Sequence, residues 1–271
     1  MFARDRSTLL EMKDRITTFL REYIGGTGYS RGVVGLSGGV DSALSYSLTC
    51  EALGAENAIG VIMPSSFSSR ESLENAERIV KIYNGVKRIY DISPVVDSFS
   101  ALLDAASVDE DSRIRLGNIQ ARTRMIILYN VASEVGGLVV GTGNKSELLA
   151  GYFTQYGDGG CSIEPLGDLY KTEVWELARL VGIPKEIIDR TPSAELWKNQ
   201  TDESELGIQY QTLDEVLFLL IEKNHTPEEI EALGYGREKV DTIVELIEKS
   251  RFKRRTPPSP QLRRYNAQEL L

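Results

Sequence analysis

A short apolar run that ends in two glycines and continues into a helical pattern is the feature that most constrains this fold. Residues 32–36 are apolar and bounded by turn residues, as is typical of a buried parallel strand. The turn SGGVDS follows, and the apolar spacing after Asp41 and Ser42 predicts a helix. Glycines let the backbone approach a ligand closely, and free N–H groups at a helix start favour an anion. An ordinary tight turn is the alternative, but the two serines and the carboxylate in it favour an anion site that a divalent metal completes.

Further strands alternate with helices through the first two thirds of the chain. Short apolar runs at residues 58–63, 86–91 and 137–141 predict three more strands. Helical spacing of apolar residues is found around them, at 9–24, 69–83, 95–103, 114–134 and 171–181. This order predicts the α/β class, with a doubly wound parallel sheet flanked by helices and ligands beyond the carboxyl ends of its strands.

The last third of the chain has a different character. No strand is predicted beyond Gly182, and residues 189–210 are polar and show no periodicity. A segment of about 20 residues without structure in a compact chain is usually functional or disordered. Helices are predicted at 212–222, 227–233 and 238–249. The 271 residues are expected to form one domain, with an α/β core at about 1–181, C-terminal helices at 211–251 and a basic tail at 252–271.

The composition limits the cellular compartment and the classes of binding partner that can be expected. The formal net charge of −9 disfavours a general nucleic-acid binder, which usually has a basic surplus. The two cysteines provide neither a disulfide framework nor a metal-ligand spacing, which fits a reducing compartment. The N-terminus lacks the apolar core of a signal peptide, and no apolar window is long enough to cross a membrane. We therefore expect a cytoplasmic protein that binds neither nucleic acid nor membrane.

A second glycine turn, GTGNKSE at residues 141–147, supplies a partner for Asp41. Thr142 ends a predicted strand, and Glu147 lies in the first turn of the helix that follows. Because the carboxyl ends of parallel strands share one edge of the sheet, Asp41 and Glu147 are expected to meet there. Paired carboxylates with few other ligands suit Mg²⁺ bound to substrate phosphates, whereas Glu147 taken alone would be a solvated helix acid.

Lys171 is the third candidate at this edge of the sheet. It opens a predicted helix, so its ammonium group and the helix dipole together can hold phosphate oxygens. An exposed first-turn lysine is the alternative interpretation.

The turn SGGVDS is not the common nucleotide loop G-x-x-x-x-G-K-[ST], because no lysine lies between Arg31 and Cys50. It resembles the pyrophosphate loop of the ATP pyrophosphatase superfamily. Members of that superfamily adenylate a substrate, release pyrophosphate and let a nucleophile displace AMP. The motif indicates the superfamily and says little about the substrate.

Nearly the whole chain also resembles the NAD synthetase family. The matching segments are NIQARTRM at 118–125, GTGNKSE at 141–147, YGDGG at 156–160, PLGDLYKTEVWELAR at 165–179, PSAELW at 192–197 and TDESELG at 201–207. Among them, ARTRM and YGDGG are highly specific together, although each is weak alone. The resemblance implies ATP-dependent amidation of deamido-NAD to NAD with ammonia, through an acyl-adenylate and with release of AMP and pyrophosphate.

The same resemblance implies roles for individual residues. Asp41 and Glu147 match metal ligands, and Asp158 matches the acid that lines the ammonia pocket, so Asp158 and Lys171 are the expected catalytic residues. The ATP site would comprise Gly35, Leu36, Ser37, Gly38, Gly39, Val40, Asp41, Ser42, Met63, Thr142, Lys171 and Ser193. The acceptor site would comprise Arg122, Gln155, Ser162, Phe252 and Lys253. Arg122 would reach deamido-NAD bound mainly by the other subunit of a homodimer, and residues 195–210 would order over bound ATP.

Three acceptor positions depart from the common family pattern. Gln155 replaces a lysine, Ser162 an aspartate and Phe252 a histidine. The first two exchanges leave the local charge sum unchanged, which indicates a coordinated swap. The sequence leaves open whether the acceptor is the dinucleotide or nicotinate mononucleotide.

Two alternative functions do not involve amidation of a nicotinate nucleotide. The first is a tRNA-thiolating pyrophosphatase, which typically relies on cysteines or an iron–sulfur site and on a basic RNA face. The second is a nucleotide-binding regulatory protein without turnover, which would not need Glu147, Asp158 and Lys171 in their motif contexts.

Overall fold

Four parallel strands form the centre of the molecule, in the order β3-β2-β1-β4. The computed structural model describes residues 5–103, 110–260 and 262. Its strands are β1 (Arg31–Leu36), β2 (Ala58–Ile62), β3 (Val86–Ile89) and β4 (Gly137–Val140). In the sheet Gly32 lies opposite Ala58, and Arg31 lies opposite Gly137. All four predicted strands are confirmed, each to within two residues at its ends.

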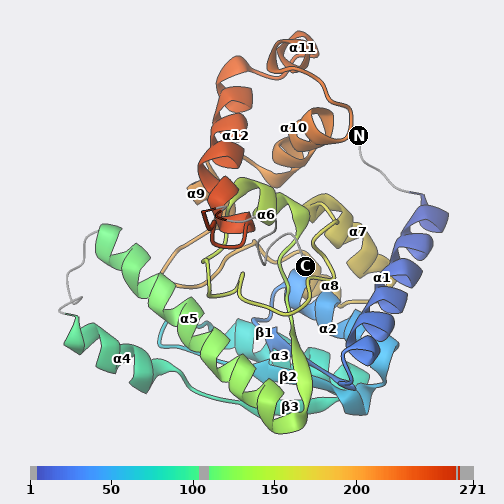
Figure 1. The fold of residues 1–271 in the computed structure, drawn as a ribbon, viewed down its shortest axis with the longest axis vertical. Helices are drawn as coiled ribbons and strands as arrows, with labels where there is room; N and C mark the ends of the chain where they lie inside the picture. Colours follow the sequence, from blue (N-terminus) through green and yellow to red (C-terminus); the bar gives the residue numbers. More distant parts are fainter. Residues whose placement is uncertain (1–4, 104–109, 261, 263–271) are drawn as a thin grey trace.

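Helices cover both faces of this sheet (Figure 1). On one face lie α1 (Arg6–Gly26), α2 (Val40–Leu53), α3 (Arg70–Tyr83) and α7 (Lys171–Leu180). On the other lie α4 (Ser93–Leu102) and α5 (Glu110–Val135). Because side chains alternate along a strand, Val34 of β1 enters the first core and its neighbour Val33 enters the second. The predicted doubly wound parallel sheet is confirmed.

The described residues from 210 to 250 are mostly helical and lie above the sheet in the view of Figure 1. Helices α10 (Tyr210–Ile221), α11 (Pro227–Ala232) and α12 (Arg237–Ser250) enclose a further apolar core. Ala150 and Tyr170, which precede these helices by at least 40 positions, also belong to this core. The C-terminal helices are therefore packed directly on the segments that carry the second glycine turn and Lys171.

Some details differ from the prediction. Residues 189–210 contain a one-turn helix, α9 (Asp202–Leu206), whose N-cap Thr201 accepts from Ser204 N. A helix this short gives no periodic signal, although a threonine before three acids is a helix-start pattern. Two further short helices, η1 (Ala55–Asn57) and α8 (Lys185–Ile188), were also not predicted.

The basic tail begins in a 3-10 turn, η2 (Arg251–Arg254), and most of the rest of it (261 and 263–271) lies outside the described residues. Throughout the part of the chain that the structure describes, no helix combines the length and apolarity needed to cross a membrane.

Candidate active site

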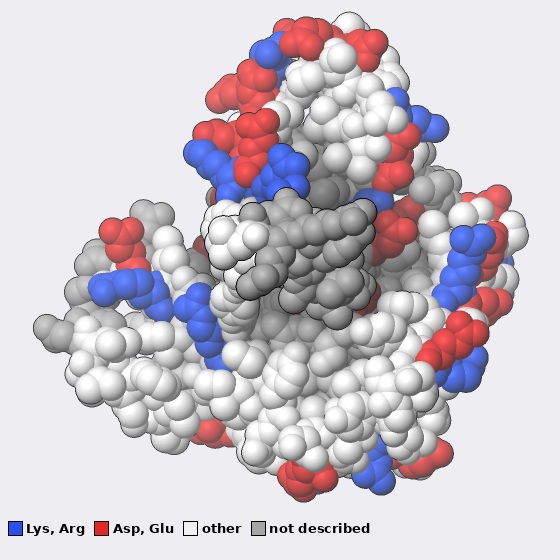
Figure 2. All heavy atoms as spheres, in the orientation of Figure 1, with Lys and Arg blue, Asp and Glu red and all other residues white. Residues whose placement is uncertain are grey.

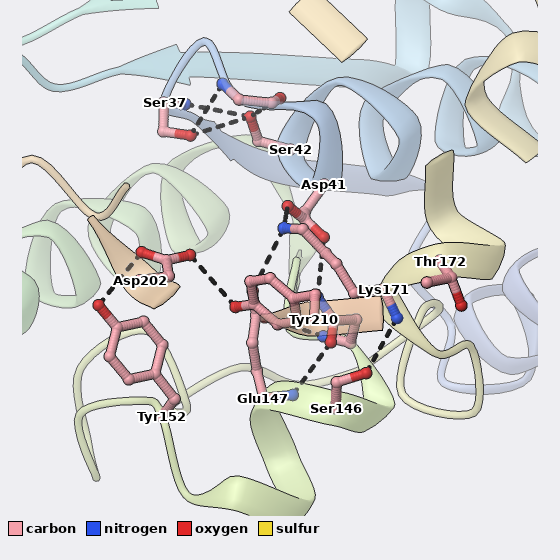
Figure 3. Close-up of polar contacts among 12 residues, drawn as sticks. Ser37, Asp41, Ser42, Ser146, Glu147, Tyr152, Lys171, Thr172, Asp202 and Tyr210 are labelled. Atoms are coloured by element: carbon pink, nitrogen blue, oxygen red, sulfur yellow. Dashed lines mark hydrogen bonds and ion pairs between the residues drawn. The ribbon is translucent and has the colours of Figure 1, made fainter. Parts of the chain in front are cut away.

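The turn between β1 and α2 has the conformation that an anion-binding loop requires. Gly38 has φ +83°, and a Cβ there would lie 2.2 Å from Ser72 O, so only glycine fits. The hydroxyl oxygens of Ser37 and Ser42 lie 3.1 Å apart, and Ser42 Oγ donates to Gly39 O at 3.0 Å (Figure 3). These bonds fix the turn internally, and the first N–H groups of α2, which have no intrahelical acceptor, are left for a ligand.

The second glycine turn meets the first through Asn144. This residue caps α6 (Lys145–Ala150), where its side chain accepts from Glu147 N at 3.0 Å and Glu147 Oε2 accepts from Asn144 N at 3.1 Å. Asn144 Nδ2 also donates to Asp41 Oδ1 at 2.9 Å. The expected convergence of Asp41 and Glu147 at the strand ends is therefore confirmed.

Lys171 points its ammonium group at both carboxylates. Its Nζ lies 2.5 Å from Asp41 Oδ2 and 3.6 Å from Glu147 Oε1. Only 2% of the lysine side chain is exposed, and the Tyr210 ring lies under Nζ at 5.2 Å to its centroid. The alternative of an exposed first-turn lysine is wrong, and so is that of a solvated Glu147, whose side chain is 15% exposed.

This corner of the molecule carries excess negative charge. Burial, and then the charge of Asp41, raise the pKa of Glu147 well above its ordinary value. Burial opposes the charge of Lys171, but Asp41 and Glu147 outweigh it and raise the pKa of the ammonium group. One lysine thus faces two carboxylates, and these can give oxygen ligands to a hard divalent cation. Among the described residues no group of three or more His, Cys, Asp or Glu side chains is placed to hold a metal ion.

A buried carboxylate of the C-terminal helices, that of Asp214, is linked to the backbone of Lys171 through Ser146. Asp214 of α10 accepts from Ser146 Oγ at 2.5 Å and from Thr172 N at 2.8 Å. Ser146 Oγ in turn accepts from Lys171 N at 2.9 Å. Burial raises the pKa of Asp214 to about 6. The start of α7 and the helix that carries Glu147 are thereby tied to one side chain.

Asp202 of α9 adds another carboxylate to the same corner. It accepts from Tyr152 Oη at 3.1 Å and from Tyr210 Oη at 3.2 Å, and Figure 3 shows it between the two rings. Burial raises its pKa, an effect that the charge of Lys171 opposes. The one-turn helix that was not predicted therefore contributes to the site.

These groups surround a cavity of about 740 Å³, the size of a small-molecule site. Gly38, which is buried within the turn, is the one expected ATP-site residue that does not line the cavity. Glu147, Asp158 and Lys253 line it as well. The expected ATP-site residues on its wall are Gly35, Leu36, Ser37, Gly39, Val40, Asp41, Ser42, Met63, Thr142, Lys171 and Ser193.

The segment 190–197, whose last three residues open the expected loop at 195–210, forms a further wall of the cavity. Glu195, with φ +48°, accepts from Ser72 Oγ at 2.6 Å, and Arg190 Nη2 donates to it at 2.5 Å. Glu195 N donates to Ser193 Oγ at 3.1 Å. Because Ser72 lies in the first turn of α3, this segment is fastened next to the SGGVDS turn.

Asp158 lies on the wall formed by residues 151–160. Its Oδ1 accepts from Thr154 N at 2.9 Å. The residue is open to solvent in the cavity, yet the surrounding walls desolvate its carboxylate, and this raises its pKa. Lys253 fastens the start of the same segment by donating from Nζ to Gly151 O at 2.8 Å and to Phe153 O at 2.9 Å.

The other expected acceptor residues lie off the cavity wall. Arg122 is exposed and donates from Nε and Nη2 to Gln155 O at 3.3 Å each. Ser162 Oγ lies 3.4 Å from Tyr129 Oη, and Phe252 exposes 62% of its surface. The structure thus brings Arg122 and Gln155 together and leaves Ser162 and Phe252 without a contact to them among its hydrogen bonds.

The polar residues of the site that were not predicted from the sequence include Asn144, Arg124, Asp202 and Asp214. Asn144, Asp202 and Arg124 lie in the segments GTGNKSE, TDESELG and NIQARTRM, so the sequence marked their positions but not their contacts. Asp214 lies in an ordinary helical pattern and has no local signal. Arg124 lines the cavity and donates from Nε to Met63 O at 3.2 Å.

The chain is similar to known proteins over nearly its whole length. The sequence model of the family described as NAD synthase matches residues 12–257. The NH(3)-dependent NAD(+) synthetase of Fusobacterium nucleatum subsp. nucleatum is 41% identical over 256 residues, which cover 94% of this chain and 97% of that protein.

Two solved structures have the same fold. An NMN synthetase from Francisella tularensis matches with a TM-score of 0.82 and 31% identity, over 94% of this chain and 99% of that one. An NH3-dependent NAD synthetase from Campylobacter jejuni subsp. jejuni, solved with the nitrate ion, matches with a TM-score of 0.77 and 30% identity, over 93% and 99%. The family match takes in both glycine turns, Lys171 and the C-terminal helices that hold it. The chain belongs to the NAD synthase family.

Proposed function

We propose that this protein is an ammonia-dependent NAD synthetase, which uses ATP and ammonia to convert deamido-NAD to NAD. One observation carries the proposal: Lys171, its two carboxylate partners and Asp158 line a single cavity beside an anion-binding glycine turn. The part of the cavity around Lys171 can bind phosphates and a metal ion. Asp158 provides a carboxylate that can accept a proton. The names of the Fusobacterium and Campylobacter proteins support the same reaction.

The first step is adenylation of the acceptor carboxylate. A carboxylate resists nucleophiles because its charge is delocalised and oxide is a poor leaving group, so AMP is installed as a better one. The N–H groups of the SGGVDS turn and the ammonium group of Lys171 hold the ATP phosphates and stabilise the departing pyrophosphate. When bound by Asp41 and Glu147, Mg²⁺ supplies further positive charge to those phosphates.

The second step is amidation. At neutral pH ammonia is mostly ammonium, which has no lone pair, so a base must remove a proton before attack. Asp158, whose pKa is raised by desolvation, is the base that we assign. The bond from nitrogen to the carbonyl carbon forms as the bond from that carbon to the AMP oxygen breaks. The wall at 190–197, fastened by Glu195, keeps water from the acyl-adenylate.

We also propose a homodimer in which the acceptor site is shared. Helix α5 carries the exposed Arg122 together with exposed Ile114, Ile126 and Tyr129. Helix α4 beside it exposes Val95, Phe99 and Leu102. Exposed apolar groups on neighbouring helices favour burial against a second copy, and a two-fold interface would set α5 beside its own repeat. Arg122 of one chain could then reach the acceptor bound by the other.

Amidation of nicotinate mononucleotide is the second candidate. The match to the Francisella NMN synthetase favours it, because an enzyme of that name forms a mononucleotide. Neutral Gln155 and Ser162, at acceptor positions where the family commonly has a lysine and an aspartate, also leave room for a different acceptor.

A tRNA-thiolating activity fits less well. The net charge is −9, and on the face shown in Figure 2 acidic side chains are interspersed with basic ones. Cys50 and Cys161 are both free, and burial raises the pKa of each thiol, that of Cys50 to about 11, which disfavours a reactive thiolate. Free thiols also support the cytoplasm as the location.

The proposal is tested by supplying the purified protein with ATP, Mg²⁺ and a nitrogen source, and with deamido-NAD or nicotinate mononucleotide as acceptor. With ammonium chloride and deamido-NAD we expect NAD, AMP and pyrophosphate in equal amounts, and with glutamine as the nitrogen source no NAD. A higher kcat/KM for the mononucleotide would select the second candidate. Absence of pyrophosphate release with both acceptors would contradict both candidates.

A further inference from the structure

Arg124 differs from the other basic residues on the cavity wall. Four such residues line the cavity within the described part of the chain: Arg124, Lys171, Arg190 and Lys253. Lys171 and Arg190 are each paired with a carboxylate, and Lys253 donates to two backbone carbonyls. Of the four, Arg124 alone has neither a carboxylate partner nor two backbone partners.

The guanidinium of Arg124 is fixed but largely unpaired. Its Nε donates to Met63 O, just after the last residue of β2, at 3.2 Å. In the part of the chain that the structure describes, Arg124 forms no ion pair and no further hydrogen bond, so both Nη groups remain available. The residue is half-buried, and burial lowers its pKa to about 10, which keeps it charged at neutral pH.

Two carboxylates near Arg124 indicate that it lies where ATP and the acceptor must meet. Asp158 and Glu195 both act on it electrostatically, although neither forms an ion pair with it. Met63 is one of the residues expected at the ATP site, and Asp158 is the base assigned to amidation. Arg124 therefore lies between the part of the cavity expected to bind ATP and Asp158, the base assigned to remove a proton from ammonium.

The reaction requires a cation at this point. The acceptor carboxylate must come close to Asp158, since the carbon that is adenylated is the carbon that ammonia attacks. Two carboxylates and an α-phosphate repel one another strongly in a desolvated cavity. A guanidinium with both Nη groups available can form a bidentate pair of hydrogen bonds with a carboxylate.

We propose that Arg124 binds the carboxylate of the acceptor through its Nη groups and thereby distinguishes the acid substrate from the amide product. During adenylation a carboxylate oxygen bonds to the α-phosphorus while the bond from that phosphorus to pyrophosphate breaks, and Arg124 stays protonated. Once the amide has formed, its neutral carbonyl binds the guanidinium more weakly. This inference rests on the proposed function.

The test compares the binding of an acid and its amide. Deamido-NAD and NAD are titrated calorimetrically into the protein saturated with Mg²⁺ and α,β-methylene-ATP, which cannot be cleaved at the α–β bond. For Arg124→Met we expect the Kd of deamido-NAD to rise roughly tenfold to hundredfold, the effect of losing a charged hydrogen-bond pair, while the Kd of NAD stays within about threefold. Arg122→Met is the matched control on the same helix, and it should weaken both ligands alike. Arg124→Lys, which keeps the charge, should recover part of the preference for the acid.

Equal weakening of acid and amide by Arg124→Met would overturn the proposal, as would no change in either. Melting temperature and α,β-methylene-ATP binding report whether the variant is folded, and if it is not, the same ligand pair is applied to Arg124→Lys and Arg124→Gln, of which only the lysine should keep the preference. Turnover by the wild type tests the proposed function separately. If the wild type amidates only the mononucleotide, the acid and amide mononucleotides replace the dinucleotide pair and the expected contrast is the same. If it amidates neither, the proposed function has failed and the assignment of Arg124 falls with it.

Discussion

Lys171 Nζ lies 2.5 Å from Asp41 Oδ2 although the two residues are 130 positions apart. The pair joins the start of α7 to the SGGVDS turn, and both side chains are largely shielded from solvent. Asp41 therefore has two neighbours of opposite character, the ammonium group of Lys171 and the carboxylate of Glu147. That arrangement keeps a lysine charged inside the protein and still leaves negative charge for a metal.

Asp41→Asn should lower the rate of pyrophosphate release by roughly 100-fold to 1000-fold, because it removes one of the two oxygen ligands that we propose for Mg²⁺ and a partner of Lys171. The fold should persist, since asparagine keeps the shape and Glu147 remains 3.6 Å from Lys171. A coupled pyrophosphate assay and a thermal melt measure the two effects. Near-normal turnover in this variant would contradict the metal assignment.

The buried carboxyl of Asp214 should make stability depend on pH. Its pKa is raised from 3.8 to about 6 in the folded state, so the folded protein binds this proton more tightly than the unfolded chain does. Stability from this group is complete below about pH 4 and is lost as the pH rises through about 6. Relative to Asp214→Asn, the free energy of unfolding of the wild type should fall by on the order of 3 kcal/mol between pH 4 and 7. Urea denaturation at several pH values measures this difference, and a constant or rising difference would count against it.

The strands and the meeting of Asp41 with Glu147 could be predicted because both follow from local patterns. Apolar runs bounded by glycines mark the strands, and parallel strands end at a common edge, so residues just past two strand ends must converge. Asn144 strengthens that convergence with a contact that only the folded geometry reveals.

The role of Asp214 could not be predicted in the same way. It reaches Ser146 and Thr172 only because α10 packs against the α/β part, and nothing in residues 210–221 specifies that packing. The same holds for Asp202, whose partners Tyr152 and Tyr210 come from separate segments. The local sequence specifies helices and strands. Buried polar networks depend instead on the packing of helices and strands that are far apart in the chain.

Asp158→Asn should slow amidation more than adenylation. The amide side chain still accepts from Thr154 N but cannot remove a proton from ammonium. Pyrophosphate release should therefore exceed NAD formation, with the surplus appearing as AMP from hydrolysed acyl-adenylate. Quenched-flow measurement of both products gives the ratio. If both half-reactions slow equally, Asp158 serves binding or structure instead.

A shared acceptor site predicts complementation between two inactive variants. Arg122→Ala and Asp41→Asn, mixed under conditions in which subunits exchange, should form heterodimers with one site that carries both lesions and one intact site. Random exchange makes half of the dimers heterodimeric, so roughly a quarter of wild-type activity should return.

The control for that experiment is the exchange itself, verified with differently tagged subunits. If Arg122 serves the site of its own chain, every site keeps one lesion and no activity returns. Such a result, with exchange confirmed, would exclude the shared-site arrangement.

In the reaction that we propose, the cavity around Lys171 and Asp158 activates a carboxylate by adenylation before nitrogen arrives. Deamido-NAD labelled with ¹⁸O in its carboxylate tests this most directly, with mass spectrometry of the products after a single turnover with ATP, Mg²⁺ and ammonium. Because a carboxylate oxygen bonds to the α-phosphorus and leaves with AMP, we predict one ¹⁸O in each AMP and none in pyrophosphate. Label in pyrophosphate or inorganic phosphate, or unlabelled AMP alongside labelled water, would contradict the account.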